Sequence, residues 1–112
     1  MGDTVFGRIL RGELPADIVH EDARCIAFRD VNPQAPTHVL VIPRKPIPKV
    51  ADAAPEDAEL LGHLLLVAGK VARQLGHEDY RLVINNGAGA GQTVFHLHVH
   101  LLAGRPFGWP PG

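Results

Sequence analysis

The stretch Thr93-Val94-Phe95-His96-Leu97-His98-Val99-His100-Leu101-Leu102 alternates imidazole and apolar side chains through its centre. Successive side chains of a β-strand point to opposite faces, so His96, His98 and His100 are expected on one face of a strand over residues 93–102. The other face is expected to carry Phe95, Leu97, Val99 and Leu101. Imidazoles two positions apart on a strand are separated by about 7 Å. The three rings can therefore surround one small chemical group.

Three interpretations of this histidine row (His96, His98 and His100) are open on the residues alone. The rings can be solvated side chains on the wet face of an edge strand. They can be neutral zinc ligands, with His38 on a neighbouring strand as a further ligand. Alternatively, one imidazole can be a covalent nucleophile while the others orient it and stabilise charge.

A glycine-rich loop lies directly upstream of the row. Gly87, Gly89 and Gly91 allow sharp turns and close approach to a ligand, and Gly91-Gln92-Thr93 offers successive N–H groups, an amide and a hydroxyl. No Gly-Lys-Ser/Thr follows and the loop leads into a strand, which excludes a Walker loop and a dinucleotide fingerprint. An anion cradle beside a histidine row favours a phosphoryl-transfer site.

Length and composition limit the other classes of function. The 112 residues fit one domain, and 11 basic against 12 acidic side chains give a net charge of −1, which does not favour nucleic acid as a partner. A single cysteine, Cys25, excludes an intrachain disulfide and favours a reducing, cytoplasmic location. The sequence shows neither a membrane span nor a signal peptide, so no membrane partner is expected.

Periodicity, glycines and prolines predict an α+β fold with a five-stranded antiparallel sheet, one short helix and one long helix. Asp3 is the expected N-cap of the short helix, and the long helix is expected to begin at Pro55 and to stop at Gly76. The long helix is apolar over more than one stripe, which indicates burial against both the sheet and a partner subunit. The expected ranges are 4–10 and 55–75 for the helices, and 17–21, 24–29, 37–42, 80–85 and 93–102 for the strands.

The sequence as a whole resembles the histidine triad superfamily, and within it the Hint branch. The resemblance rests on the His-x-His-x-His-x-x pattern at 96–102, and on segments 4–9, 30–38 and 91–94. The ending Trp109-Pro110-Pro111-Gly112 favours Hint over the diadenosine-polyphosphate hydrolase branch. The resemblance implies a single domain over residues 1–112, with a tail at 103–112 that shapes the substrate site, and a homodimer with a continuous sheet.

The resemblance also implies a purine nucleoside phosphoramidase that uses no metal or other cofactor. His98 falls at the position of the nucleophile, His100 and Thr93 at phosphate and leaving-group contacts, and His96 and His38 complete a four-histidine cluster. An AMP-type or GMP-type nucleotide would be bound by Asp30 at the ribose, by Asn85, Gly91 and Gln92 near the phosphate, and by Phe6, Ile9, Phe28 and Val31 in an apolar purine slot. Two alternatives are a dinucleoside polyphosphate hydrolase and a nucleotide-binding interaction protein with incidental activity.

The remaining histidines and the cysteine have no role in this scheme. His20, His63 and His77 are expected to be surface residues, and Cys25 is expected to be an inert thiol buried in a strand.

Overall fold

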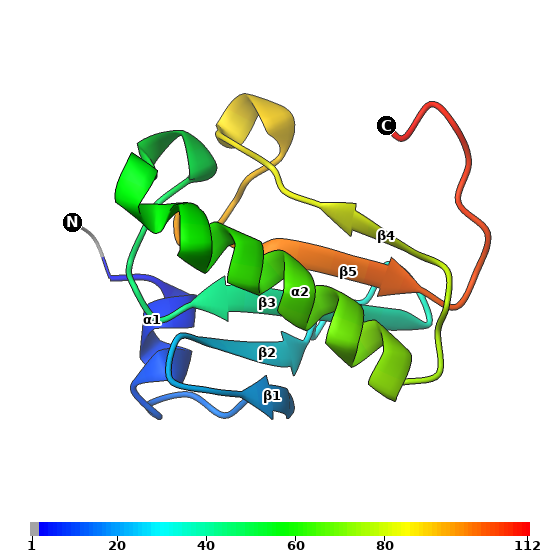
Figure 1. Ribbon diagram of the computed structural model, residues 1–112, viewed down its shortest axis with the longest axis horizontal. Helices are drawn as coiled ribbons and strands as arrows, with labels where there is room; N and C mark the ends of the chain where they lie inside the picture. Colours follow the sequence, from blue (N-terminus) through cyan, green and yellow to red (C-terminus); the bar gives the residue numbers. More distant parts are fainter. Residues whose placement is uncertain (1–2) are drawn as a thin grey trace.

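The computed structural model describes residues 3–112, which fold around one five-stranded antiparallel sheet (Figure 1). The strand order across the sheet is β1-β2-β3-β5-β4, so β1 and β4 are the edges. This confirms the predicted α+β class. The strands are β1 (Ile18–Glu21), β2 (Cys25–Arg29), β3 (Thr37–Pro43), β4 (Tyr80–Val83) and β5 (Val99–Ala103).

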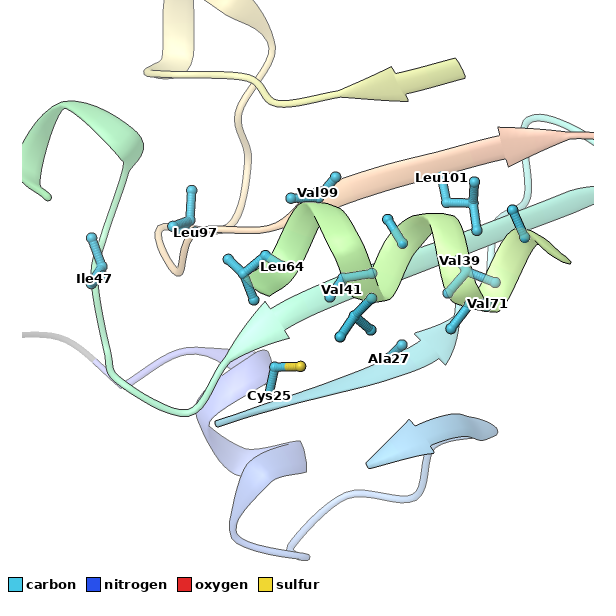
Figure 2. Packing of buried hydrophobic residues seen from close by; sticks show 13 residues of the cluster. Cys25, Ala27, Val39, Val41, Ile47, Leu64, Val71, Leu97, Val99 and Leu101 are labelled. Atoms are coloured by element: carbon cyan, nitrogen blue, oxygen red, sulfur yellow. The ribbon is translucent and has the colours of Figure 1, made fainter. Parts of the chain in front are cut away.

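The long helix α2 (Ala58–Gln74) lies across one face of the sheet and covers the main hydrophobic core (Figures 1 and 2). Leu64, Val67 and Val71 of α2 pack onto Val39 and Val41 of β3, and onto the side chains of β2 and β5 that point the same way. Helical residues begin with a 3-10 turn at Pro55–Asp57. The helix ends at Gln74 with Leu75 as its C-cap, and Gly76, the predicted stop, follows with φ +88°.

The short helix α1 (Val5–Leu10) lies against the opposite face. Phe6 packs there with Ile26, Phe28, Leu40 and Ile42, which alternate along β2 and β3 with the residues that face α2. The N-cap is Thr4, whose Oγ1 accepts the N–H of Gly7 at 3.0 Å, and not Asp3 as predicted. The Asp3 carboxylate instead accepts a hydrogen bond from Arg11 at 2.8 Å.

The hairpin of β1 and β2 has the predicted antiparallel pairing, although Ala23 is a poor turn residue. Asp22 holds the turn, because its Oδ1 accepts the backbone N–H of Arg24 at 2.7 Å and of Cys25 at 2.9 Å. A tight turn usually contains a residue such as glycine that tolerates unusual φ values. Here the hydrogen bonds of the Asp22 carboxylate stabilise the turn instead.

Two predicted strands are shorter than the sequence pattern indicates. β5 begins only at Val99, because the preceding Leu97 N–H bonds to the carbonyl of Ile47 at 2.7 Å and so leaves the sheet. β4 ends at Val83, two residues before the predicted end. Short 3-10 turns also occur at Val50–Asp52 and Ala88–Ala90, where irregular backbone was predicted. Within residues 3–112, no helix is both long and apolar enough to cross a membrane.

Candidate active site

A cleft of about 430 Å³ opens on the face of the sheet that carries α1. Phe6 and Ile9 of α1, Phe28 of β2 and Leu40 of β3 give it apolar walls. Five polar side chains line the same cleft: Arg29, Asp30, Thr93, His98 and His100. A neighbouring depression shares Thr93 and Val94 with the cleft and extends past them to Phe95 and Pro48.

The predicted alternation along the histidine row is present, although only His100 lies within a regular strand. Leu97, Val99 and Leu101 are in the core under α2, whereas Phe6 contacts His96 and His98 on the opposite face. Phe95 is half exposed and lies outside that core, contrary to expectation. His98 is only 7 % exposed and β5 lies between β3 and β4, so the solvated edge-strand interpretation is wrong.

His98 is held in one tautomer by the backbone. Its Nδ1 lies 2.8 Å from the carbonyl oxygen of His96, and a carbonyl can only accept, so Nδ1 carries the proton. Burial lowers the pKa of His98 below the usual histidine value, which keeps the ring neutral at neutral pH. The Nε2 lone pair is therefore free, and the ring itself lines the cleft.

His38 fixes the tautomer of His100 in the same way. The N–H of Gln34 donates to His38 Nδ1 at 3.0 Å, so neutral His38 carries its proton on Nε2 and donates it to His100 Nδ1 at 2.9 Å. Neutral His100 must then carry its own proton on Nε2. Burial, and then the neighbouring His98 and His38, lower the pKa of His100 to about 4.

The Asp30 side chain lines the cleft and also approaches His38 of this pair. Its Oδ2 is 3.4 Å from His38 Nε2, and its Oδ1 accepts the N–H of Asn32 at 2.8 Å. The carboxylate is thus positioned to accept the His38 proton if His100 no longer does. Asp30, His38 and His100 also bring ligand-type atoms within 4.8 Å of one another, a group that contains two of the four histidines of the zinc interpretation.

His96 is buried beneath the site and is absent from the cleft lining. Its Nε2 donates to the carbonyl of Pro43 at 2.7 Å, and its ring lies edge-on to Phe6, with centroids 6.4 Å apart. His96 therefore fixes the backbone that carries the His98 acceptor, and it is a positioning residue.

Residues 11–107 match the family description "HIT domain". The chain belongs to the HIT domain family. It is 66 % identical to an uncharacterised HIT-like protein of Synechocystis sp. over 98 % of this chain and 97 % of that protein. The crystal structure of a HIT family hydrolase from Legionella pneumophila superposes with a TM-score of 0.95 at 48 % identity, covering 98 % of this chain and 100 % of that chain. A histidine triad nucleotide-binding protein from Candida albicans superposes with a TM-score of 0.80 at 30 % identity, covering 96 % of this chain and 83 % of that chain.

The glycine-rich loop of this HIT domain bonds two of the three N–H groups expected in the anion cradle, those of Gly91 and Gln92, to its own carbonyls. The N–H of Gly91 bonds to the Ala88 carbonyl at 3.0 Å, and that of Gln92 bonds to the Gly87 carbonyl at 3.1 Å. The Gln92 amide is also occupied, since it accepts the Gly87 N–H and donates to the carbonyls of Pro48 and Val94. Asn85, Gly91 and Gln92 do not line the cleft, and of the loop end only Thr93 and Val94 do.

The expected purine slot coincides with the apolar part of the cleft. Phe6, Ile9 and Phe28 line it, and Val31 lies at its rim with a fully exposed side chain. Leu40 was not predicted, although it lies opposite His100 in the β3–β5 register and therefore forms the wall beside that ring. The alternation His38-Val39-Leu40 could have indicated it. Five further lining residues had no signal in the sequence: Val5, Leu14, Pro15, Ala16 and Arg29.

The tail of the HIT domain lies away from the cleft of its own chain. Arg81 of β4 donates to the Gly108 carbonyl at 2.8 Å, and the guanidinium groups of Arg81 and Arg105 lie over the Phe107 ring. No residue of 103–112, all of which the structure describes, lines the cleft, and Trp109 is 84 % exposed. The tail therefore does not shape the substrate site within one chain.

His20, His63 and His77, predicted to be surface residues, are partly buried and make polar contacts. His77 Nε2 lies 2.8 Å from the Thr37 hydroxyl, and the Nε2 atoms of His20 and His63 both lie within 2.8 Å of Asp22 Oδ2. Cys25 is fully buried as predicted, and its thiol also faces Asp22.

Proposed function

We propose that this HIT domain is a nucleoside phosphoramidase, which hydrolyses the P–N bond of purine nucleoside 5′-phosphoramidates through a covalent nucleotidyl-His98 intermediate. The observation that supports it best is the state of His98: a buried, neutral ring at the cleft, with Nδ1 bound to a carbonyl and Nε2 free. An unprotonated imidazole nitrogen with a fixed orientation is the nucleophile that such chemistry requires.

The nucleotide is proposed to bind with its base between the apolar walls and its phosphate at the rings of His98 and His100. Phe6, Ile9 and Phe28 would contact the purine, and the Asp30 carboxylate would accept hydrogen bonds from the ribose hydroxyls. Thr93 lies where the cleft meets the neighbouring depression, so its hydroxyl would contact phosphate at the boundary to the leaving amine. A cleft of about 430 Å³ suits one mononucleotide.

In the first step, His98 Nε2 attacks phosphorus, the P–Nε2 bond forms and the P–N bond to the amine breaks. An amine is a poor anionic leaving group, so it must leave with a proton. We assign that proton to His100 Nε2, because Nδ1 of the same ring is occupied by His38. The negative phosphate favours the charged form of His100 and so opposes the burial that lowers its pKa.

Protonation of His100 also changes its contact with His38. A doubly protonated His100 no longer accepts the His38 Nε2 proton, and Asp30 Oδ2, at 3.4 Å, is the acceptor that can replace it. In this proposal Asp30 and His38 are positioning residues for the acid. In the second step, water attacks phosphorus, the P–Nε2 bond of His98 breaks, and His100 takes the proton of the water.

A metal-dependent alternative is less well supported by the geometry of the row. His98 Nδ1 and His96 Nε2 are both directed at backbone carbonyls, so the two rings do not present those nitrogens to a shared point in the cleft. The covalent proposal uses no cofactor. A dinucleoside polyphosphate could use the same nucleophile and is the second candidate substrate, because the depression beyond Thr93 can admit a larger leaving group.

The activity is tested by incubating the chelator-treated protein with an adenosine 5′-phosphoramidate and comparing it with His98→Ala. We expect turnover without added metal, and a loss of at least about 10³-fold in kcat/KM for His98→Ala. If chelation abolishes turnover by the wild type while His98→Ala retains activity, the result supports the metal-dependent alternative. Binding of AMP without turnover by either protein would favour a nucleotide-binding interaction protein.

A further inference from the structure

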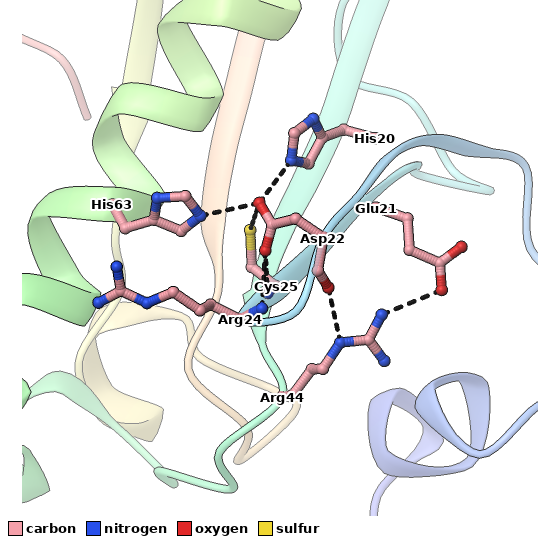
Figure 3. A network of polar contacts seen from close by, with 7 residues as sticks. All are labelled: His20, Glu21, Asp22, Arg24, Cys25, Arg44 and His63. Atoms are coloured by element: carbon pink, nitrogen blue, oxygen red, sulfur yellow. Dashed lines mark hydrogen bonds and ion pairs between the residues drawn. The ribbon is translucent and has the colours of Figure 1, made fainter.

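A second cluster of metal-ligating side chains lies outside the cleft, where the β1–β2 hairpin meets α2 (Figure 3). It contains His20 and Asp22 from one side of the turn, Cys25 from the start of β2, and His63 from α2. We propose that these four side chains form a tetrahedral binding site for a thiophilic divalent metal ion of the Zn²⁺ class.

The donor atoms of the two histidines and of the cysteine all lie close to one carboxylate oxygen of Asp22. Asp22 Oδ2 lies 2.7 Å from His20 Nε2, 2.8 Å from His63 Nε2 and 3.5 Å from Cys25 Sγ (Figure 3). The donor atoms of His20, Asp22 and Cys25 lie within 4.8 Å of one another. Ligands of one zinc ion at distances of about 2.0–2.3 Å can be at most about 4.6 Å apart. The donor atoms of His20, Asp22 and Cys25 therefore already have nearly the spacing that one ion requires, and His63 Nε2 contacts the same carboxylate oxygen from α2.

The ligand types suit zinc and related ions. Two imidazoles, one thiolate and one carboxylate form a nitrogen, sulfur and oxygen set of the kind that zinc binds with four protein ligands. Metal binding forms four coordinate bonds and releases the thiol proton of Cys25 to solvent, because only the thiolate coordinates. Neutral His20 and His63 each give up the Nε2 proton that faces Asp22 and take one on Nδ1, which frees both Nε2 lone pairs for the ion without a net change in protonation. The Asp22 and Cys25 anions then balance the two charges of the ion.

The surroundings of the cluster already orient the ligands. Asp22 Oδ1 is occupied by the N–H groups of Arg24 and Cys25, which leaves Oδ2 for the ion. Arg44 donates to the Asp22 carbonyl and pairs with Glu21 at 3.0 Å, so that its charge is compensated. Cys25 is fully buried, and the side chains of Asp22 and His63 are each just over a quarter exposed, which leaves an entry path.

The proposed ion would connect elements that are distant in sequence. His63 lies 41 residues from Asp22, and the ion would link the hairpin to the helix over the main core. The histidine row lies on the other face of the sheet, so the proposed site is separate from the cleft. Its role would be to stabilise the hairpin against α2.

Co²⁺ is the probe for the test, because it replaces zinc and gives visible bands. Cys25 is the only cysteine in the sequence, so a thiolate-to-Co²⁺ charge-transfer band reports this site alone. We expect the chelator-treated protein to bind one equivalent of Co²⁺ with that band and with the intense bands of tetrahedral geometry. His63→Gln should weaken Co²⁺ binding at least about tenfold, and Cys25→Ala should abolish the charge-transfer band.

His77→Gln is the matched control, since His77 is also a partly buried histidine with one polar contact but lies at Thr37. It should bind Co²⁺ as the wild type does, and circular dichroism establishes that each variant is folded. Absence of the charge-transfer band in the wild type would overturn the proposal. Unchanged Co²⁺ affinity in folded His63→Gln would overturn the four-ligand site.

Discussion

At the residue scale, the hydrogen-bond partners of each ring decide which nitrogen of each histidine carries a proton. The alternation of imidazole and apolar residues predicted which side chains share a face, and this is what the structure has. It could not predict the tautomers of His96 and His100, because the deciding partners are distant in sequence: the Pro43 carbonyl for His96 and the His38 ring for His100. Nor could it find the Asp22 cluster, since His63 is distant in sequence from the other three ligands.

The proposed role of His100 predicts that nucleotide binding is coupled to proton uptake. At about pH 5.5, between the usual histidine pKa of about 6.5 and the value of about 4 in the free site, His100 starts neutral and becomes charged beside the phosphate. We expect AMP binding to take up more protons in the wild type than in His100→Gln. Titration calorimetry in buffers of different ionisation enthalpy measures the difference, and equal uptake by the two proteins would contradict the assignment.

A second prediction at this scale concerns His38. Removal of its ring in His38→Ala leaves His100 Nδ1 without its donor, so the His100 ring loses its fixed orientation. Because that orientation is needed when the amine leaves, we expect kcat to fall at least about tenfold, with a smaller change in KM. Steady-state kinetics separates the two parameters. A change in KM alone would indicate that His38 only shapes the binding cleft.

At the scale of the helices and strands, tertiary contacts override the local sequence pattern at some element ends and not at others. Gly76 and Pro55 predicted the limits of the helical segment well, because capping and helix initiation are local effects. The last strand was predicted too long, since the bond from Leu97 to Ile47 competes with the sheet ladder before Val99. The loop at 87–92 looked like an open anion cradle, but its N–H groups close the loop on itself.

Gly91 provides the test of that closed loop, because its φ of +97° disfavours any residue with a Cβ. We expect Gly91→Ala to lower the free energy of unfolding by about 1 kcal/mol. Gly89→Ala is the control in the same loop, where a Cβ meets no atom within 4 Å and φ is not positive. Urea denaturation compares the two variants, and equal stabilities would argue against the strained position.

At the scale of the whole molecule, two leucines of α2 form an apolar surface that the described residues 3–112 do not cover. Leu66 of α2 is 76 % exposed and Leu65 is 45 % exposed. The same helix lies close to the edge strand β4, because a Cβ on Gly69 would lie 2.9 Å from the Tyr80 hydroxyl. This surface is where we propose that a second copy packs. A dimer there would also give the tail a partner chain to contact, since the tail lies beside β4 through Arg81.

We therefore expect the protein to sediment as a dimer and Leu66→Glu to sediment as a folded monomer, since a buried unpaired carboxylate is costly. Ile18→Glu is the matched control, because Ile18 is 44 % exposed on β1 at the opposite edge of the sheet. It should remain dimeric. A monomeric wild type at micromolar concentrations would exclude the dimer.

The central claim is that His98 forms a covalent bond to phosphorus, and the stereochemistry at phosphorus tests it most directly. One diastereomer of an adenosine 5′-thiophosphoramidate is hydrolysed in ¹⁸O-labelled water, and the configuration of the product thiophosphate is determined. Attack by His98 followed by attack of water gives two in-line displacements, so we predict overall retention. Overall inversion would show that water attacks phosphorus directly, and would contradict the nucleotidyl-His98 intermediate.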